Sequence, residues 1–537
     1  MNNGSRRNPF LSGVTALTLS TLVVKVIGLV YKIPMMHYLG AEGMGYFNSA
    51  YELYSLFFVI ATAGLPVAVS ILISENVARG RLRNVKKIYG ASFAVFLAIG
   101  LAGALLLCLF SKQFAAAVGS PDASLAIATI APTVFFVSVA AVVRGYFQGK
   151  QNMVPTAVSQ VIEALGKLIL GILLAAFAVK QGWPADKTAA VAVVGLVVGT
   201  AISMLYLLLS QALKRFREDG TLTDATTEPS PKILRRLFAL AIPVTVSASL
   251  SSLTRVADMT LILRRMTDIG YDATVATAMF GSYSTLAVPI YHLPSSLIAG
   301  IAVSLVPTLT EAVESRDRLR ADRLIADALR LCAFVAIPCS LGLSVFSRSI
   351  LSMLFFEQAE AVALTAPLLS CLGLSVFSSC LVTVTGAVLQ ANRRMVEPIF
   401  SMAAGIVVKL ISAYILIGTP SVGMMGAPIS TLLCNLAAVG MNFYYIEKHD
   451  AFRGRIFGLF MRPTLSAGAA IAVAVAVFLA VRPHFTESIS FLGALACCAV
   501  VYFAAAIKLG VVGESDLALM PKGLRKCFDK GKHKNKV

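Results

Sequence analysis

Charged side chains inside apolar stretches of the sequence are the residues best placed to do chemistry. The cations are Lys25, Lys32, Lys167, Arg255 and Lys409, and the acidic residues are Glu52, Glu163 and Asp258. A charge near the middle of a membrane span costs about 2.5–3.5 kcal/mol on insertion scales, so it usually faces a cavity or a partner. Because the cations outnumber the acids, a cavity that they line would attract an anion. A cavity for cationic drugs would instead need unpaired carboxylates.

The spacing of these charges predicts which of them are paired. Glu163 and Lys167 stand at i and i+4, and Arg255 and Asp258 stand at i and i+3, so each couple shares a helix face and forms an ion pair. Each ion pair could line a cavity or could only fix helix packing, and both interpretations stay open.

The other cations differ in their depth within the apolar stretches. Lys25 and Lys409 lie near the middle of stretches that contain no acidic partner, which favours a position in a cavity. Lys32 follows Lys25 by seven residues and shares its helix face. Lys32 and Arg144 lie nearer the ends of their stretches, where extension of the side chain to the membrane surface is the simpler interpretation.

The elements that position these charges are the helices of an all-α, polytopic membrane protein. The chain is 57% hydrophobic and 14% charged, with a mean hydropathy of +0.81, whereas a soluble domain has about 45–50% apolar and about 25% charged residues. A spanning helix needs about 20 mostly apolar residues. Fourteen stretches qualify: 12–36, 46–73, 88–110, 123–147, 155–178, 188–209, 236–263, 276–307, 326–347, 361–389, 398–417, 425–446, 463–481 and 488–510.

Basic residues predict how these spans are oriented. Lys and Arg concentrate in the connections after even-numbered spans and in the C-terminal tail. By the positive-inside rule these segments are cytoplasmic, so both termini of this plasma-membrane protein face the cytoplasm. The net charge of +19 comes from these clusters, which predicts contact with anionic membrane lipid and not with nucleic acid. The first stretch is too long for a cleaved signal peptide and is expected to be retained as a span.

The chain also contains an internal repeat. A shift of 242 residues aligns Gln148 with Gln390, so the fourth and fifth spans recur as the tenth and eleventh. A weaker match aligns Glu75 with Glu311. Two parallel six-span lobes followed by two extra spans explain both matches. The predicted boundaries are 1–213 for the N-terminal lobe, 214–236 for a cytoplasmic linker, 237–447 for the C-terminal lobe, 448–511 for the two extra spans and 512–537 for a basic tail.

Other kinds of chemistry find little support. The nine Cys lie in apolar stretches without metal-ligand spacing, the five His are dispersed, and the sequence has no nucleotide-binding or hydrolase motif. We expect no metal, no cofactor and no enzymatic activity. Pro289 and Pro294, on either side of His292, predict a bend in the eighth span.

Two segments resemble a known family. The run from Arg144 to Thr156 (RGYFQGKQNMVPT) and the connection Tyr38–Tyr46 (YLGAEGMGY) are similar to the MurJ-like SpoVB/YtgP group of the multidrug/oligosaccharidyl-lipid/polysaccharide exporter superfamily. The resemblance covers essentially the whole chain. It implies a fold of fourteen spans and a flippase for a lipid-linked oligosaccharide, with the peptidoglycan precursor lipid II as the expected substrate.

Our hypothesis is alternating access around a central cationic cavity, in which Lys25, Arg255 and Lys409 bind the substrate pyrophosphate through charge-assisted hydrogen bonds. Membrane potential or an ion gradient would drive transport, and cell-wall synthesis proteins would be partners. Two departures stand out. The Arg-Asp pair of the first span is Tyr31-Lys32 here, and Lys409 occupies the region where some relatives bind sodium, which argues against sodium coupling.

Three alternatives stay open on the sequence. One is a flippase for another lipid-linked sugar, such as a capsule or spore-cortex unit. The second is a drug or cation antiporter of the same superfamily, and the third is a non-transporting scaffold for cell-wall synthesis.

Overall fold

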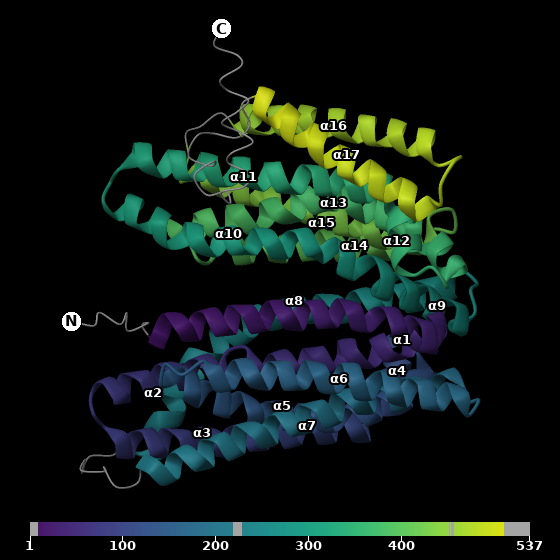
Figure 1. Ribbon diagram of the computed structural model, residues 1–537. Helices are drawn as coiled ribbons and strands as arrows, with labels where there is room; N and C mark the ends of the chain where they lie inside the picture. Colours follow the sequence, from purple (N-terminus) through teal and green to yellow (C-terminus); the bar gives the residue numbers. More distant parts are fainter. Residues whose placement is uncertain (1–8, 219–227, 450–451, 453–455, 510–537) are drawn as a thin grey trace, which may run out of the picture. The chain divides into compact units, whose positions relative to one another are not determined.

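The computed structural model describes residues 9–218, 228–449, 452 and 456–509, and these residues form helices and short connections without a strand (Figure 1). The predicted all-α membrane fold is confirmed. Thirteen helical stretches of the described chain are long and apolar enough to cross a bilayer. The basic tail at 512–537 and the centre of the predicted linker lie outside the described residues.

The first of these stretches accounts for two of the fourteen predicted crossings. It covers 56 residues, Val23–Ala78, or about 84 Å at 1.5 Å per residue, whereas the hydrocarbon core is about 30 Å thick. Helix α1 (Pro9–Thr62) breaks at Gly40, where φ is 65°. Because only glycine adopts this left-handed conformation at little cost, Gly40 marks the junction between the two crossings.

The described chain groups into two compact units by its contacts. Unit 1 contains the chain up to Pro289 together with Glu357–Thr365 and Leu410–Ala427. Its remaining helices are α2 (Leu65–Ala78), α3 (Leu82–Leu109), α4 (Ser111–Val118), α5 (Ser124–Gly149), α6 (Val154–Lys180), α7 (Ala185–Glu218), α8 (Ser230–Asp268), α9 (Ala273–Ser282) and a π-helical turn, η3 (Tyr283–Ala287).

Unit 2 is built from the later helices, apart from the first residues of α10, α13 and α15 and the end of α14 from Leu410 onward. These are α10 (Val288–Glu314), α11 (Arg318–Val345), α12 (Ser347–Leu354), α13 (Ala359–Ala391), α14 (Glu397–Ile417), α15 (Gly426–Lys448), α16 (Ile456–Val481) and α17 (Glu487–Lys508). Within unit 2, α16 packs against α11 and α17. Helix α8, predicted to open the C-terminal lobe, packs against α1 and α2 in unit 1, and the lobe boundaries stay predictions.

The predicted repeat is visible in the backbone. Gln151 and Arg393, 242 residues apart, are non-glycine residues with φ of 57° and 61°. Gly80 and Arg316, related by the weaker match, have φ of 70° and 57°. Left-handed non-glycine residues are uncommon, so their recurrence at matched positions supports the internal repeat.

Two pairs of glycines set the close approach of α6 and α7. A Cβ added at Gly195 would collide with the backbone of Gly171, and one added at Gly166 would collide with Gly199. Small residues let membrane helices pack backbone to backbone. This contact fixes the positions of Glu163 and Lys167, which lie on α6.

Candidate functional site

Six charged side chains of unit 1 form a network inside the predicted spans, here called the intramembrane charge cluster. Its members are Lys32 and Glu52 on α1, Arg144 on α5, Glu163 and Lys167 on α6, and Arg255 on α8. Tyr51 and Tyr54 connect them, because both interact electrostatically with Glu163 and each also interacts with one of the two arginines. The cluster joins helices that are far apart in the sequence.

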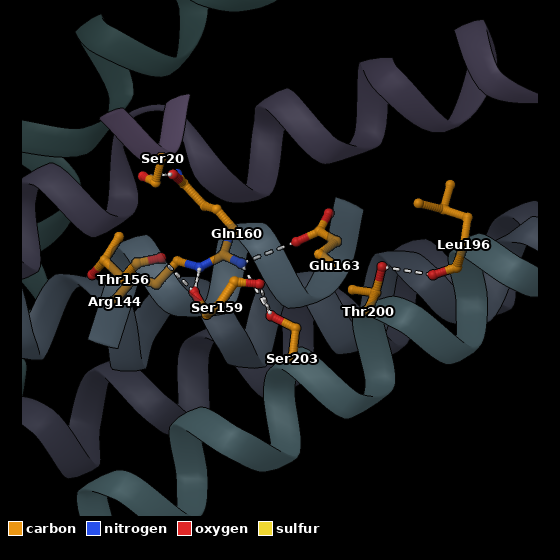
Figure 2. Close-up of polar contacts among 9 residues, drawn as sticks. All are labelled: Ser20, Arg144, Thr156, Ser159, Gln160, Glu163, Leu196, Thr200 and Ser203. Carbon is orange, nitrogen blue, oxygen red and sulfur yellow. Dashed lines mark hydrogen bonds and ion pairs between the residues drawn. The ribbon is translucent and has the colours of Figure 1, made fainter. Parts of the chain in front are cut away.

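Arg144 is held in a polar site between α5, α6 and α7 (Figure 2). Its guanidinium donates to the Ser159 hydroxyl at 3.0 Å, the Glu163 carboxylate at 2.9 Å and the Ser203 hydroxyl at 3.3 Å. Ser203 in turn donates to the Ser159 carbonyl at 2.8 Å. Arg144 is only 9% exposed, so the predicted extension to the membrane surface is wrong. A buried charge needs such partners to offset its lost hydration.

The predicted ion pair between Glu163 and Lys167 is also wrong. The carboxylate of Glu163 bonds Arg144, while Lys167 interacts with Glu163 only as a neighbouring charge. The Lys167 ammonium lies 4.5 Å from the ring centroid of Tyr51 and 4.8 Å from that of Tyr31. A cation over an aromatic face is attracted by the ring quadrupole, so Lys167 is held without a carboxylate of its own.

Arg255 is paired across helices. Its guanidinium donates to the Glu52 carboxylate on α1 at 3.0 Å and to the Ser252 and Ser55 hydroxyls at 2.8 and 3.2 Å. The carboxylate that it bonds is therefore Glu52 and not Asp258, one turn away on α8. The Arg255 side chain remains 44% exposed, so it can still approach a ligand.

Lys32 donates a hydrogen bond to a backbone carbonyl of the π-helical turn η3. In the π-helical turn η3 each carbonyl pairs with the N–H five residues later, as Val288 does with Tyr283. The partner of the Ser284 carbonyl would be Pro289, which has no N–H. The Lys32 ammonium donates to this carbonyl at 2.9 Å. Lys32 supplies the donor that Pro289 cannot provide, and the bend predicted from Pro289 and Pro294 stays a prediction.

The charge cluster has a surplus of positive charge. Four cations face two carboxylates, which leaves a formal charge of +2. The two arginines make the ion pairs, and neither Lys32 nor Lys167 has a carboxylate within ion-pair distance among the described residues. Their partners are a carbonyl and aromatic rings, both neutral. In a medium of low dielectric such a surplus attracts an anion.

Three further predicted site residues lie on α1, α8 and α14. Lys25 is an exposed residue of α1, and Asp258 is a half-buried residue of α8. Lys409 is half-buried on α14 and belongs to unit 2. Their roles at a substrate site stay predictions.

Unit 2 contains an apolar groove of about 440 Å³ between α10, α11, α16 and α17. Leu297, Leu343, Phe346, Phe491 and Leu495 are among its lining residues. A groove with this lining can hold a hydrocarbon chain but offers almost nothing to a polar headgroup.

The role of Arg144 is the main feature of the cluster that the sequence did not reveal. Its partner Glu163 is nineteen residues away on the next helix, beyond the range of spacing rules within one helix. The serines at 159 and 203 look like ordinary small residues of a membrane helix. The only sequence signal for a partner of Arg144 was the opposite charge of Glu163 in the following span.

Comparison with known proteins identifies a family and several bacterial relatives that the chain resembles. A family model described as "Polysaccharide biosynthesis protein" matches residues 10–313, which is more than half of the chain. Two relatives from Bacillus subtilis (strain 168) are 26% identical to it. "Lipid II flippase MurJ" aligns over 83% of this chain and 84% of its own length, and "Stage V sporulation protein B" aligns over 79% and 81%.

Solved structures share the fold. A structure of lipid II flippase MurJ in an inward closed conformation superposes with a TM-score of 0.71 at 16% identity, covering 91% of this chain and 97% of that one. An inward-facing multidrug resistance MATE family transporter superposes with a TM-score of 0.64 at 17% identity, covering 81% and 98%. At these identities the likeness concerns the architecture alone.

Proposed function

Because the chain belongs to the polysaccharide biosynthesis protein family, we propose that it is a flippase for a lipid-linked oligosaccharide, and that its substrate is lipid II. It would act in a bacterial plasma membrane by alternating access, with both termini in the cytoplasm. Two relatives at 26% identity, one named a lipid II flippase and one a sporulation protein, support this class of substrate. On this proposal the protein moves its substrate without making or breaking covalent bonds, so it is not an enzyme.

The surplus positive charge on Lys32 and Lys167 is the observation that carries the proposal. A lipid-linked oligosaccharide presents a pyrophosphate, which is the group most costly to move through a bilayer. Two ammonium groups with neutral partners can turn to this anion without abandoning a carboxylate. Arg255, which is partly exposed, adds a planar guanidinium suited to phosphate oxygens.

The apolar groove of unit 2 supports a lipid-linked substrate over a soluble one. The substrate carries a long hydrocarbon chain, and the groove offers an apolar lining of a size suited to such a chain. The hydrocarbon chain of the substrate would remain in contact with lipid while its polar headgroup crosses the membrane.

Membrane potential would contribute to the driving force. Moving one charge through 100 mV is worth about 2.3 kcal/mol, and the inside-negative potential favours outward movement of an anionic headgroup. Lys409, predicted to occupy the region of a sodium site, supports coupling to the potential over coupling to sodium.

A drug or cation antiporter of the same fold is the second candidate, since MATE transporters superpose on the chain. Such a protein needs carboxylates available to a cationic drug or a proton. Both carboxylates of the charge cluster are occupied by arginines, which favours the flippase.

Accessibility of lipid II at the outer surface tests the proposal directly. In a Gram-positive strain depleted of its own lipid II flippases, we expect the protein to restore cleavage of lipid II by an added external enzyme. Lys167→Ala should lose this activity because the surplus charge is reduced. Lys180→Ala, which removes an exposed lysine from the end of the same helix, should keep it. Good membrane expression without restored cleavage would contradict lipid II as the substrate.

A further inference from the structure

A second pocket lies in unit 1, apart from the charge cluster. It has a volume of about 380 Å³ and is formed by the first turns of α3 and the last turns of α5 and α7. Lys86, Tyr89 and Gly90 contribute from α3, Tyr146 from α5, Lys150 from the position directly after α5, and Leu208 from α7. Figure 1 shows these three helices side by side, in agreement with their contacts. The transport proposal makes no use of this pocket.

One side of the pocket is polar and cationic. Lys86 and Lys150 come from different helices and both line it. The Lys150 ammonium lies 4.7 Å from the ring centroid of Tyr146, and the Tyr146 ring packs edge-on against Tyr89 with centroids 5.1 Å apart. Two lysines that line the same pocket can together bind an anion with several oxygens.

The pocket also has apolar lining residues, and an exposed apolar surface continues from it along α3. Phe93 and Leu208 line it. Gly90 lies on the helix face that also carries Leu97 and Leu101, whose side chains are 39% and 49% exposed. Exposed leucines on a spanning helix face the lipid, so the apolar side of the pocket adjoins the bilayer.

The sequence around the pocket places it at the cytoplasmic leaflet. The connection before α3 carries Arg79, Arg81 and Arg83, and Lys150 lies in the basic connection after α5. Such connections are cytoplasmic by the positive-inside rule. The inner leaflet is rich in anionic lipid, which basic residues at the membrane surface attract.

We propose that this pocket binds an anionic phospholipid from the cytoplasmic leaflet. Lys86 and Lys150 hold the phosphate, and the start of an acyl chain lies against Phe93 and Leu208. A soluble phosphate compound would share the contacts with the lysines but would leave the apolar side empty. The site would therefore bind the whole lipid more tightly than its headgroup.

The single tryptophan of the chain makes a local test practical. In the Trp183→Phe background, Phe93→Trp places the only tryptophan in the pocket wall. We expect brominated phosphatidylglycerol to quench its fluorescence at several-fold lower mole fraction than brominated phosphatidylcholine. Lys86→Gln and Lys150→Gln should each reduce this preference by roughly fivefold, the effect of one basic group near an anionic surface.

A pocket-filling variant provides the control for specific binding. A Cβ at Gly90 or at Gly468 meets no atom within 4 Å, but only Gly90 lines the pocket. Gly90→Leu should abolish the preference for the anionic lipid, and Gly468→Leu should leave this preference unchanged. Equal quenching by the two lipids in the parent protein would overturn the proposal. Displacement by soluble glycerol phosphate as effective as that by unbrominated phosphatidylglycerol would also overturn it.

Discussion

The ammonium of Lys32 donates to the carbonyl of Ser284, 252 positions later in the chain, at 2.9 Å. The carbonyl needs this donor because its π-helical partner position is Pro289. Asn48 supports the same turn by donating to the hydroxyls of Ser284 and Thr285, both at 2.8 Å. Lys32, a member of the charge cluster, thus also stabilises the backbone of this π-helical turn.

Replacing Lys32 should expose this double role. Lys32→Met leaves the Ser284 carbonyl without a donor, which costs about 1–3 kcal/mol for a buried polar group. In a Pro289→Ala background the restored N–H can serve the carbonyl, so the same replacement should cost less than about 1 kcal/mol. Thermal unfolding of the four proteins in detergent measures the difference. Equal losses in both backgrounds would contradict the assigned role of Pro289.

Removing Arg144 should be more damaging than removing an exposed arginine. Arg144→Ala leaves the Glu163 carboxylate half-buried and unpaired, and breaking a buried ion pair costs about 3–5 kcal/mol. Arg144→Ala with Glu163→Ala should recover part of this loss, because no charge is left uncompensated. Arg235, exposed on α8, provides the matched control. The unfolding midpoint and the yield of monodisperse protein are the measurements, and a loss no larger than that of Arg235→Ala would refute the buried network.

The ring of Tyr51 should matter more than its hydroxyl. Tyr51→Phe keeps the aromatic face below the Lys167 ammonium, whereas Tyr51→Leu removes an interaction worth about 0.5–2 kcal/mol. We expect transport to survive in the first variant and to fall several-fold in the second. Transport assays at matched membrane expression compare them. Equal activities would mean that the ring does not position Lys167.

The glycine contacts between α6 and α7 predict a sharp difference between two valine substitutions. Gly195→Val should prevent the close approach to Gly171, because its Cβ would overlap the backbone there. Gly440→Val on α15 adds the same side chain where nothing lies within 4 Å. The first variant should express poorly or unfold at clearly lower temperature, and the second should resemble the parent. Similar stability for both would argue against backbone packing of these helices.

Filling the apolar groove should impair transport without unfolding the protein. Gly342 lines the groove, and a Cβ there meets no atom within 4 Å. Gly342→Leu would occupy the space proposed for a lipid chain, so lipid II exposure should fall several-fold while the unfolding temperature is retained. Gly440→Leu is the matched control. Normal transport by Gly342→Leu would exclude the groove as a lipid-chain site.

The sequence predicted the spans well because hydropathy acts over whole helices. Each of the fourteen stretches overlaps one or two helices of the described chain, and the first two share one long run broken at Gly40. The repeat was also predictable, since Gln148 and Gln390 precede two turns of the same backbone geometry. Hydropathy is a local property of each segment, and the repeat depends only on similarity between segments. Neither prediction requires the rotation of a helix about its axis.

The partners of the charges were much harder to predict. Spacing within one helix predicted that Glu163 pairs with Lys167 and that Arg255 pairs with Asp258. The structure instead pairs Glu163 with Arg144 and Arg255 with Glu52. The rotation and packing of the helices decide which charges form ion pairs, and neither can be derived from the sequence of a single span. The same holds for Lys32, whose partner is a backbone carbonyl.

The turns after α2, α5, α10 and α13 share one pattern of backbone hydrogen bonds. At each of them, one N–H bonds three residues back and the next N–H bonds five residues back, as Gln151 and Asn152 do with Gln148 and Phe147 and as Arg393 and Arg394 do with Gln390 and Leu389. The residue types have diverged to the point where arginine stands in one copy for glycine in the other. The same pattern also follows α4, α6 and α8, where it begins at a glycine, so the backbone turn tolerates a change of side chain that the matched positions record.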